Sequence, residues 1–323
     1  MTTRFANNHP SPVRRPARPR AIVARHAPGV PPRLAPGDPS PRAARRTYAG
    51  ARCLVTGASS GLGRALAEHL ARQSALVLLT GRSAARLGEV VESLVAEGVP
   101  RANLRVVAAD LTVHDDRRRL IAEATTAFGA LDVLINCAGV GAYGHFETHH
   151  PSVLRSLVDL NLIALAELTR AALPLLRLGR RPSVVNIGSV VARRGIPGRT
   201  EYTASKFAVA GFTESLRAEW AIYGIHVLLV NPGFTATEFG RNLVVDTAVY
   251  ATDDRRRMTA DQVAAATLVA LRKRKYEVTL TAGGRLLLLL NRLVPGLIHL
   301  AFNLWSLSIH GRIHADPGPS EPT

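Results

Sequence analysis

Residues 52–63 read Arg-Cys-Leu-Val-Thr-Gly-Ala-Ser-Ser-Gly-Leu-Gly, and this stretch decides the fold. The apolar run Cys53–Thr56 predicts a strand buried on both faces, and the run Leu62–Arg72 predicts an amphipathic helix. The glycines between them allow a ligand to approach the backbone closely, and a helix N-terminus presents unpaired N–H groups and a partial positive charge. The stretch therefore predicts a strand–loop–helix unit that holds a phosphate group.

Outward from this unit, short apolar runs alternate with amphipathic stretches. The predicted strands are 53–56, 75–80, 104–108, 133–136, 183–187, 226–231 and 277–281, and the predicted helices are 62–72, 84–97, 115–128, 153–178 and 203–223. A further helix is expected at Thr259, where Thr259-Ala260-Asp261-Gln262 forms a capping box. This alternation predicts an α/β fold with a doubly wound, Rossmann-like parallel sheet, in one domain from about residue 48 to 283.

A second motif carries proton-transfer chemistry. Tyr202 and Lys206 stand four residues apart in Tyr-Thr-Ala-Ser-Lys, and Ser189 precedes Tyr202 by thirteen residues. Positions i and i+4 share a helix face, and a nearby cation favours phenolate, so we expect a tyrosine tuned as a general acid or base. The structural alternatives are a serine that ends a strand and an aromatic residue that starts a helix.

Together the two motifs resemble the compact branch of the short-chain dehydrogenase/reductase family, and the resemblance covers most of residues 50–282. It implies NAD(P)-dependent hydride transfer between a nicotinamide and a carbonyl or secondary alcohol. By this resemblance Tyr202 delivers a proton, Ser189 donates a hydrogen bond to the same oxygen, and Lys206 also binds the nicotinamide ribose. Asn161 would order a water that links Lys206 to solvent, and helices 153–178 and 203–223 would form a homodimer or homotetramer.

The resemblance extends to further cofactor contacts. Asp110-Leu111 resembles an adenine contact, and Asn136-Cys137-Ala138-Gly139 resembles an NNAG segment with Cys137 in place of the second Asn. Residues 232–237 resemble a PGxxxT turn that holds the nicotinamide amide through Thr237. The expected cofactor-binding residues are Thr56, Gly57, Ser59, Ser60, Gly61, Leu62, Gly63, Arg82, Asp110, Leu111, Asn136, Ala138, Gly139, Tyr202, Lys206, Pro232, Gly233, Thr235 and Thr237.

The choice of cofactor depends on the end of the second strand, Leu79-Thr80-Gly81-Arg82-Ser83. An acidic residue there would bind both ribose hydroxyls and repel a 2′-phosphate, and none is present. Arg82 has a fork of donors suited to phosphate, and Ser59 can add a hydroxyl. We therefore expect NADP rather than NAD; the alternative is that Arg82 is a solvated loop arginine.

Composition divides the chain unevenly. The formal charge is +17, and residues 1–47 alone hold ten arginines, one acid and ten of the 20 prolines. This stretch predicts a disordered tail, without a secretory signal and with no specific nucleic-acid partner. Cys53 and Cys137 fall in predicted core strands and suggest no disulfide, which fits a cytoplasmic location. His145, His149 and His150 lack a completing ligand set, so we expect no metal there and assign Tyr143–His150 to the rim of a substrate cleft.

Residues 284–310 are strongly apolar but are interrupted by Arg292 and Pro295-Gly296. Polar positions from Arg292 to His310 form a narrow stripe, which predicts two short amphipathic helices meeting at Pro295, followed by a flexible tail from 311 to 323. Their apolar faces would form a lid, a dimer contact or a peripheral membrane contact, the last helped by the basic run 272–275. Residues 234–258 are expected to form a mobile substrate loop.

These apolar surroundings favour a bulky, hydrophobic, lipid- or steroid-like carbonyl or alcohol as the substrate. One alternative is an NAD-linked hydroxysteroid-type dehydrogenase that uses the same site. Another is a non-catalytic nucleotide-binding regulator, against which the intact trio of Ser189, Tyr202 and Lys206 argues.

Overall fold

The computed structural model describes residues 47–236, 239–240, 243–247 and 257–313, and for 309–313 only the backbone. Except for Thr47, the predicted tail of residues 1–47 lies outside the described residues. So do residues 237–238, 241–242 and 248–256 of the predicted substrate loop, and residues 314–323 of the predicted C-terminal tail. The main helices are α1 (Gly61–Ala71), α2 (Ala84–Ala96), α3 (His114–Phe128), α4 (Ser152–Val158), α5 (Leu165–Arg177), α6 (Thr200–Glu219), α7 (Ala260–Arg272), α8 (Ala282–Leu293) and α9 (Pro295–Ile313).

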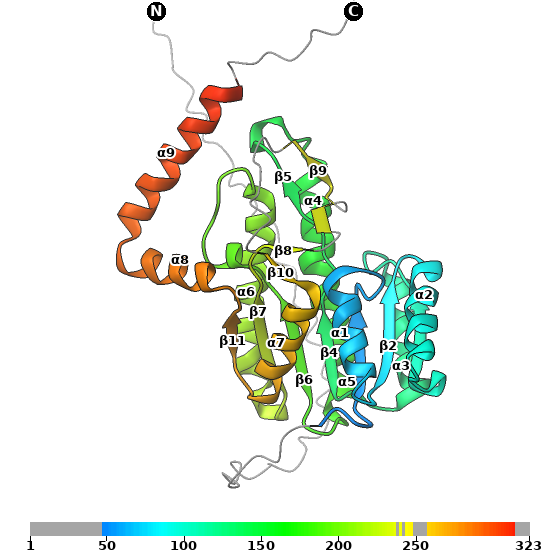
Figure 1. Cartoon of the computed structure of the whole chain (residues 1–323). Coiled ribbons are helices and arrows are strands. Elements are labelled where there is room, and N and C mark those ends of the chain that lie inside the picture. Colours follow the sequence, from blue (N-terminus) through cyan, green and yellow to red (C-terminus); the bar gives the residue numbers. More distant parts are fainter. Residues whose placement is uncertain (1–46, 237–238, 241–242, 248–256, 314–323) are drawn as a thin grey trace, which may run out of the picture. The chain divides into compact units, whose positions relative to one another are not determined.

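Seven parallel strands form the central sheet (Figure 1). They are β1 (Arg52–Thr56), β2 (Leu76–Gly81), β3 (Leu104–Ala108), β4 (Val133–Asn136), β6 (Ser183–Ile187), β7 (His226–Asn231) and β11 (Glu277–Thr279). Their spatial order is β11-β7-β6-β4-β1-β2-β3, so the chain reverses direction across the sheet between β1 and β4. In open α/β sheets ligands bind at the carboxyl ends of the strands beside such a switch point. The predicted doubly wound parallel sheet is confirmed.

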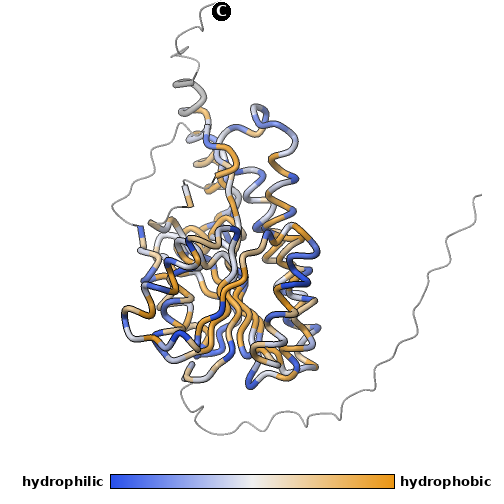
Figure 2. The backbone as a smooth tube through the Cα atoms, turned by 90° about the vertical axis from the view of Figure 1, so that its right-hand side faces the viewer, coloured by the Kyte–Doolittle hydropathy of each residue, from blue (hydrophilic) through white to orange (hydrophobic). Residues whose placement is uncertain are grey.

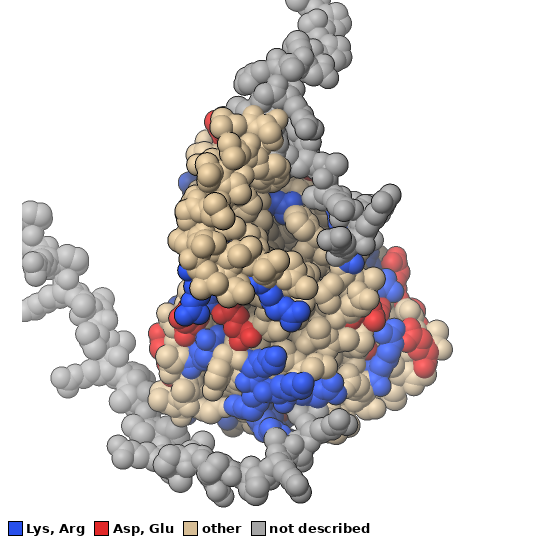
Figure 3. All heavy atoms as spheres, turned by 60° about the vertical axis from the view of Figure 1, so that its left-hand side comes forward, with Lys and Arg blue, Asp and Glu red and all other residues tan. Residues whose placement is uncertain are grey.

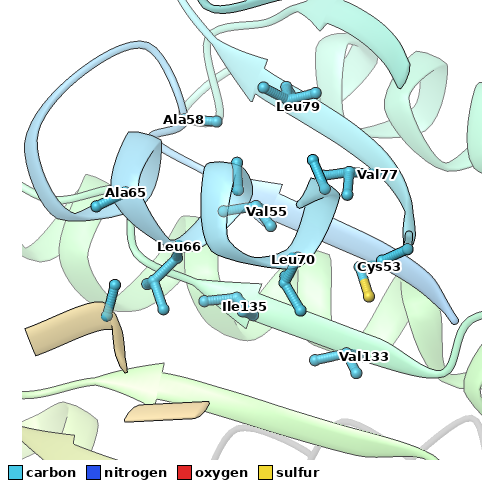
Figure 4. Close-up of a cluster of buried hydrophobic side chains, with 14 of the residues drawn as sticks. Cys53, Val55, Ala58, Ala65, Leu66, Leu70, Val77, Leu79, Val133 and Ile135 are labelled. Carbon is cyan, nitrogen blue, oxygen red and sulfur yellow. The ribbon is translucent and has the colours of Figure 1, made fainter. Parts of the chain in front are cut away.

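Helices cover both faces of the sheet because successive strand residues point to opposite sides. Cys53 and Val55 pack under α1 with Leu66 and Leu70, as Figure 4 shows. Leu54, between them in the sequence, instead joins the cluster formed with α3, α5 and α6. Figure 2 shows these strands as a continuous hydrophobic centre. Burial on both faces explains why the strands read as unbroken apolar runs rather than as alternating patterns.

The predicted helix 153–178 is continuous but irregular. It begins as α4, passes through a π-helical segment over Asp159–Ala164, and continues as α5. π-helical turns are rare and often occur at functional sites, and this one contains Asn161. At the other end of the chain, the capping box predicted at Thr259 is present, with Gln262 donating its backbone N–H to Thr259 Oγ1.

The C-terminal segment forms two helices that meet at Pro295, as predicted. However, α9 has 19 residues, longer than expected, and α8 is bent from it by 118°. This bend breaks the single polar stripe that the sequence suggested from Arg292 to His310. Among the described residues no single helix is long and apolar enough to span a membrane. The bent pair Ala282–Leu293 and Pro295–Ser308 reaches the length and the apolar composition of a span only when both helices are counted together.

Two minor sheets build the rim above the carboxyl ends of the main strands. β5 (Ala142–Tyr143) pairs with β9 (Val245–Asp246), and β8 (Thr235–Ala236) pairs with β10 (Met258–Thr259). Both pairs connect the segment after β4 or β7 to the region predicted as the substrate loop. The first of these pairs joins segments that are about a hundred residues apart in the chain.

Candidate active site

A large cavity of about 1450 Å³ lies at the carboxyl ends of the strands. Ligand pockets usually measure about 300–1000 Å³, so this cavity has room for two ligands side by side. Its wall includes the glycine loop, Arg82, Asp110, Ser189, Tyr202 and Lys206. The fold therefore brings the two sequence motifs, about 140 residues apart, to the same cavity.

The glycine loop is shaped for an anion that approaches the backbone. Gly57 has a φ of +67°, and a Cβ on Gly63 would lie 2.2 Å from the Gly57 carbonyl oxygen. The N-cap residue Ser60 makes no side-chain cap to α1, and the first turn of α1 contains no acid. The N–H groups of this turn are thus available to a ligand, and the residues fit the pyrophosphate of a dinucleotide.

Two arginines border the end of the cavity next to β2. Arg82 is exposed and lines the cavity together with Ser59, whose hydroxyl lies close to Gly81. Arg86, one turn along α2, lines the same wall, and its backbone N–H bonds to Ser83 Oγ. The sequence analysis named Arg82 but missed Arg86. The signal that could have found it is its place in the first turn of the helix that follows Arg82, since that turn begins at the same end of the sheet.

Two of the expected cofactor contacts do not reach the cavity wall. Thr56 is buried, and its hydroxyl oxygen accepts the backbone N–H groups of Cys137 and Ala138 at 2.9 and 3.0 Å. Asn136 is buried as well and donates to Asn186 Oδ1 at 2.8 Å. The hydrogen bonds of both side chains are made inside the protein. Thr56 therefore holds the loop after β4, whereas Asn136 joins the end of β4 to α5 and β6.

The remaining contacts expected from the resemblance mostly line the cavity. Asp110 lies on the wall, where its carboxylate accepts two hydrogen bonds from Thr112. The wall also includes the other glycine-loop residues and those of the later loops: Gly57, Ser60, Gly61, Leu62, Gly63, Leu111, Ala138, Gly139, Pro232, Gly233 and Thr235. Thr237, expected to hold a nicotinamide amide, lies outside the described residues. Cys137 also lines the cavity, just beyond the end of β4.

The proton-transfer residues meet on the side of the cavity formed by β6 and α6. Ser189 follows β6, and its hydroxyl hydrogen-bonds to the phenol of Tyr202. Tyr202 and Lys206 both lie on α6, with the ammonium 5.8 Å from the centre of the Tyr202 ring. Lys206 Nζ donates a hydrogen bond to the carbonyl of Ile187 at 2.9 Å. The predicted convergence of these three side chains is present in the fold.

The electrostatics differ from the expectation. Burial raises the pKa of Tyr202 above its ordinary value; Tyr143 raises it further, and only the Ser189 hydrogen bond and the charge of Arg199 lower it. Burial also lowers the pKa of Lys206 to about 8. The expected net lowering of the tyrosine pKa is therefore wrong for the protein alone, because desolvation outweighs the nearby charges. In the protein alone, the charge that lowers the pKa of the Tyr202 phenol comes from Arg199.

Asn161 occupies the π-helical segment and is buried. Its Oδ1 accepts the Val140 N–H, while its Nδ2 donates to the Val140 carbonyl and to Ser205 Oγ, each at 2.9 Å. This amide fixes the segment after β4 to α6, on which Tyr202 and Lys206 lie. The predicted water link from Asn161 to Lys206 stays a prediction.

The histidine cluster contributes a buried hydrogen-bonded pair. His149 Nδ1 lies 2.7 Å from Glu201 Oε1, and both side chains are 2% exposed. Glu201 directly precedes Tyr202 on α6, so this pair joins the rim segment to the first turn of the catalytic helix. His145 and His150 make separate local contacts. In the described part of the chain no three metal-binding side chains gather at one point.

Comparison with known proteins agrees with this site. Residues 51–247 match the family model described as short chain dehydrogenase. The bovine protein named dehydrogenase/reductase SDR family member 7B is 34% identical over 254 residues, which cover 76% of this chain and 78% of that protein. Mouse 17-beta-hydroxysteroid dehydrogenase type 1 is 34% identical over 194 residues, 59% of this chain and 56% of that protein.

Solved structures share the fold. An alcohol dehydrogenase from Thermococcus sibiricus, complexed with 5-hydroxy-NADP, has a TM-score of 0.62 and 23% identity, and the match covers 71% of this chain and 94% of that one. A 3-ketoacyl-(acyl-carrier-protein) reductase from Brucella melitensis, complexed with NADH, has a TM-score of 0.63 and 24% identity, covering 72% and 98%.

Proposed function

The chain belongs to the short-chain dehydrogenase family and is an NAD(P)-dependent oxidoreductase, and from this premise we propose that it interconverts a carbonyl group and a secondary alcohol with NADP as its preferred cofactor. The observation that carries the proposal is the meeting of Ser189, Tyr202 and Lys206 on the wall that also includes the glycine loop. Bound NADPH would supply the hydride.

The chain's own residues would manage the charge that develops on the substrate oxygen. The Tyr202 phenol donates a proton to that oxygen, and the Ser189 hydroxyl donates a hydrogen bond to it. Lys206, with its pKa lowered to about 8, remains a cation at neutral pH and favours the tyrosinate that proton donation leaves. Because Tyr202 is buried, water is largely excluded from the phenol that transfers the proton.

The proposed preference for NADP is supported by Arg82 and Arg86 at the β2 end of the cavity. Both offer planar donor groups suited to a phosphate, and no acidic residue occurs between Thr80 and Arg86. Ser59 and Ser83 supply hydroxyls on the same wall. The alternative is an NAD-linked dehydrogenase of hydroxysteroid type, for which the same catalytic residues would serve.

Nucleotide binding tests this proposal. We expect NADPH to bind at least ten times more tightly than NADH, and Arg82→Ala and Arg86→Ala each to weaken only NADPH, by about tenfold or more. Arg118→Ala, at an exposed arginine on α3, is the matched control. Equal affinities for both nucleotides would favour the NAD-linked alternative. Folded protein that binds neither nucleotide would favour a different role on this fold and overturn the proposal.

The proposed substrate is a bulky, hydrophobic carbonyl compound or alcohol. Beyond the catalytic residues, part of the cavity wall is apolar and includes Val190, Ile196, Phe239, Leu280 and Leu287. The beginning of α8 supplies Leu287, so this helix acts as part of the cavity wall. That contact supports the lid function among the three alternatives for the C-terminal segment.

The rest of this segment presents a broad apolar surface, for which we propose contact with a membrane. Leu286, Leu289 and Leu293 on α8, and Leu300 and Leu304 on α9, are each more than half exposed. Figure 3 shows no charged groups over most of this upper region. From residue 278 to 315 the sequence contains no acid, while Arg285 and Arg292 flank the leucines. An apolar face with flanking cations and no acid suits an anionic lipid surface.

The basic run 272–275, for which a contact with anionic headgroups stays a prediction, lies apart from these leucines in the chain. It joins the end of α7 to the start of β11, whereas α8 follows the opposite end of that strand. Flotation of the whole protein with anionic and neutral vesicles, compared with a Leu289→Glu, Leu293→Glu variant, tests the contact. Loss of flotation in the variant supports it. A dimer that does not float, and that the variant dissociates, would assign the surface to a subunit contact instead.

A further inference from the structure

At the end of the cavity away from Arg82, a buried guanidinium lies without a carboxylate partner among the described residues. Arg199 is 8% exposed, occupies the N-cap position of α6, and lines the cavity. Among the residues that the structure describes, no carboxylate lies within salt-bridge distance of it. Asp159 and Asp246 also line the cavity, but neither pairs with Arg199. A buried, unpaired charge is costly, so such a group usually serves a ligand or an active site.

The surroundings of Arg199 fix its orientation rather than neutralise it. The guanidinium carbon lies 4.0 Å from the centre of the Tyr143 ring and 4.6 Å from that of Phe234. Two such contacts hold the cation by its attraction to the aromatic faces. The N–H donors of a guanidinium lie in its plane. In the described residues the only acceptor for them is the Tyr143 hydroxyl, at 3.3 Å.

The charge of the cavity points to an additional anion. Among the described residues, its wall contains six cationic side chains and three carboxylates: Arg82, Arg86, Arg199, Lys206, Arg257 and Arg285, against Asp110, Asp159 and Asp246. Arg82 and Arg86 lie at the end assigned to the nucleotide phosphate. Arg199 instead precedes Tyr202 by three residues and lies close enough for its charge to act on the phenol. An anion bound by Arg199 would therefore belong to the molecule whose carbonyl meets Tyr202.

We propose that Arg199, held between Tyr143 and Phe234, is a binding site for an anionic group of the substrate, so that the enzyme acts on hydrophobic keto acids or hydroxy acids. This proposal rests on the proposed function and narrows its substrate class. A carboxylate can accept two parallel N–H bonds from a guanidinium, which would place the apolar part of the molecule against the rest of the wall. Neutral ketones of equal size would leave Arg199 buried and unpaired, and would bind more weakly for that reason.

Matched pairs of ligands test the site. The probes are 4-oxopentanoate, 6-oxoheptanoate and 10-oxoundecanoate, each compared with its methyl ester, because the distance between ketone and carboxylate is unknown. Their affinities for the full-length protein are measured by calorimetry, with and without NADP⁺ so that no turnover occurs. We expect at least one acid to bind ten times or more tightly than its ester, which is the effect of one charge-assisted hydrogen-bond pair.

Variants assign the effect to Arg199. Arg199→Gln should remove the preference for the acid and change the affinity of the ester less than threefold, while Arg199→Lys should retain part of it. Arg155→Gln, at an exposed arginine on α4, is the matched control and should change neither. The kinetic readout distinguishes binding from catalysis. A substrate-binding role raises KM for acids alone, whereas a role limited to tuning Tyr202 lowers kcat for acids and esters alike and would overturn the proposal.

The two proposals fail in different ways. Acids and esters that bind equally to wild-type protein at every chain length overturn the anion site, even when both are reduced with NADPH. An acid preference that depends on Arg199, without reduction or oxidation by either nucleotide, supports the anion site and instead overturns the proposed function. Because the wild-type comparison needs no substitution, a variant that fails to fold does not prevent a decision.

Discussion

The two ends of the cavity are built in different ways. At the nucleotide end, one short loop supplies Gly57 and residues 59–63 to the wall, and three of these six residues are glycines without a side chain. At the substrate end, Tyr143, Arg199 and Phe234 come from three separate segments of the chain and meet through their side chains. The first arrangement suits a ligand that is the same in many enzymes. The second can change one side chain at a time, which suits a ligand that differs between enzymes.

The largest expected effect is at the boundary between the two ends. Tyr202→Phe keeps the ring and its contact with Phe239 but removes the proton donor. We expect kcat to fall by about 10²- to 10⁴-fold while nucleotide affinity stays within a few-fold. Steady-state kinetics and fluorescence titration measure the two quantities. A variant that retained wild-type kcat would show that the proton comes from another group and that Tyr202 is not the proton donor.

Lys206 provides a pH-dependent test of the same boundary. Burial lowers its pKa to about 8 from an ordinary value of 10.5, so the unfolded chain binds more protons than the folded one between these values. The free energy of unfolding should therefore rise with pH through this range, by about 3 kcal/mol relative to Lys206→Met. Chemical denaturation at several pH values between 7 and 11 measures it. If the difference in the free energy of unfolding between wild type and Lys206→Met did not change with pH, Lys206 would not be a buried cation.

Two glycine substitutions test whether the glycine loop at the nucleotide end is as tightly packed as its geometry indicates. Alanine at Gly63 would place its Cβ 2.2 Å from a backbone carbonyl oxygen, which cannot move aside. We expect Gly63→Ala to lower the free energy of unfolding by about 3 kcal/mol and to weaken nucleotide binding. Gly88→Ala, on α2 with nothing within 4 Å, should instead raise it by about 0.5–1 kcal/mol. Thermal and chemical unfolding measure the stability of both variants. Equal changes in the free energy of unfolding would show that the loop around Gly63 has room for a Cβ.

A smaller effect is expected at the substrate end. His149→Leu removes the partner of the buried Glu201 carboxylate, whose Oε2 has no hydrogen-bond partner among the described residues. We expect about 2 kcal/mol less stability and a raised KM, with nucleotide affinity unchanged. His150→Leu, at the exposed neighbour, should change stability by no more than about 0.5 kcal/mol. If His149→Leu weakened nucleotide binding as strongly as it raised KM, the two ends would not be independent.

The sequence by itself determined the fold and the nucleotide end. Buried parallel strands read as unbroken apolar runs, and the glycine loop and the Tyr202–Lys206 pair are local patterns in which spacing fixes geometry. Helix boundaries came within a few residues for the same reason, and the break at Pro295 followed from the missing N–H of proline. The α–π–α course of 152–177 was not predicted, because hydrophobic periodicity does not register one extra residue in a turn.

Only the tertiary structure decided the substrate end and the electrostatics. Nothing local marks Arg199, Tyr143 and Phe234 as neighbours, since their contact depends on three separate segments of the chain. Likewise, the tyrosine pKa rises because burial, which no motif records, outweighs the charges nearby. Thr56 and Asn136 lie at the positions that the motifs give, but their side chains make hydrogen bonds to other residues of the protein interior. Spacing along the chain fixes which residues share an element, whereas desolvation and contact between elements depend on how the elements pack.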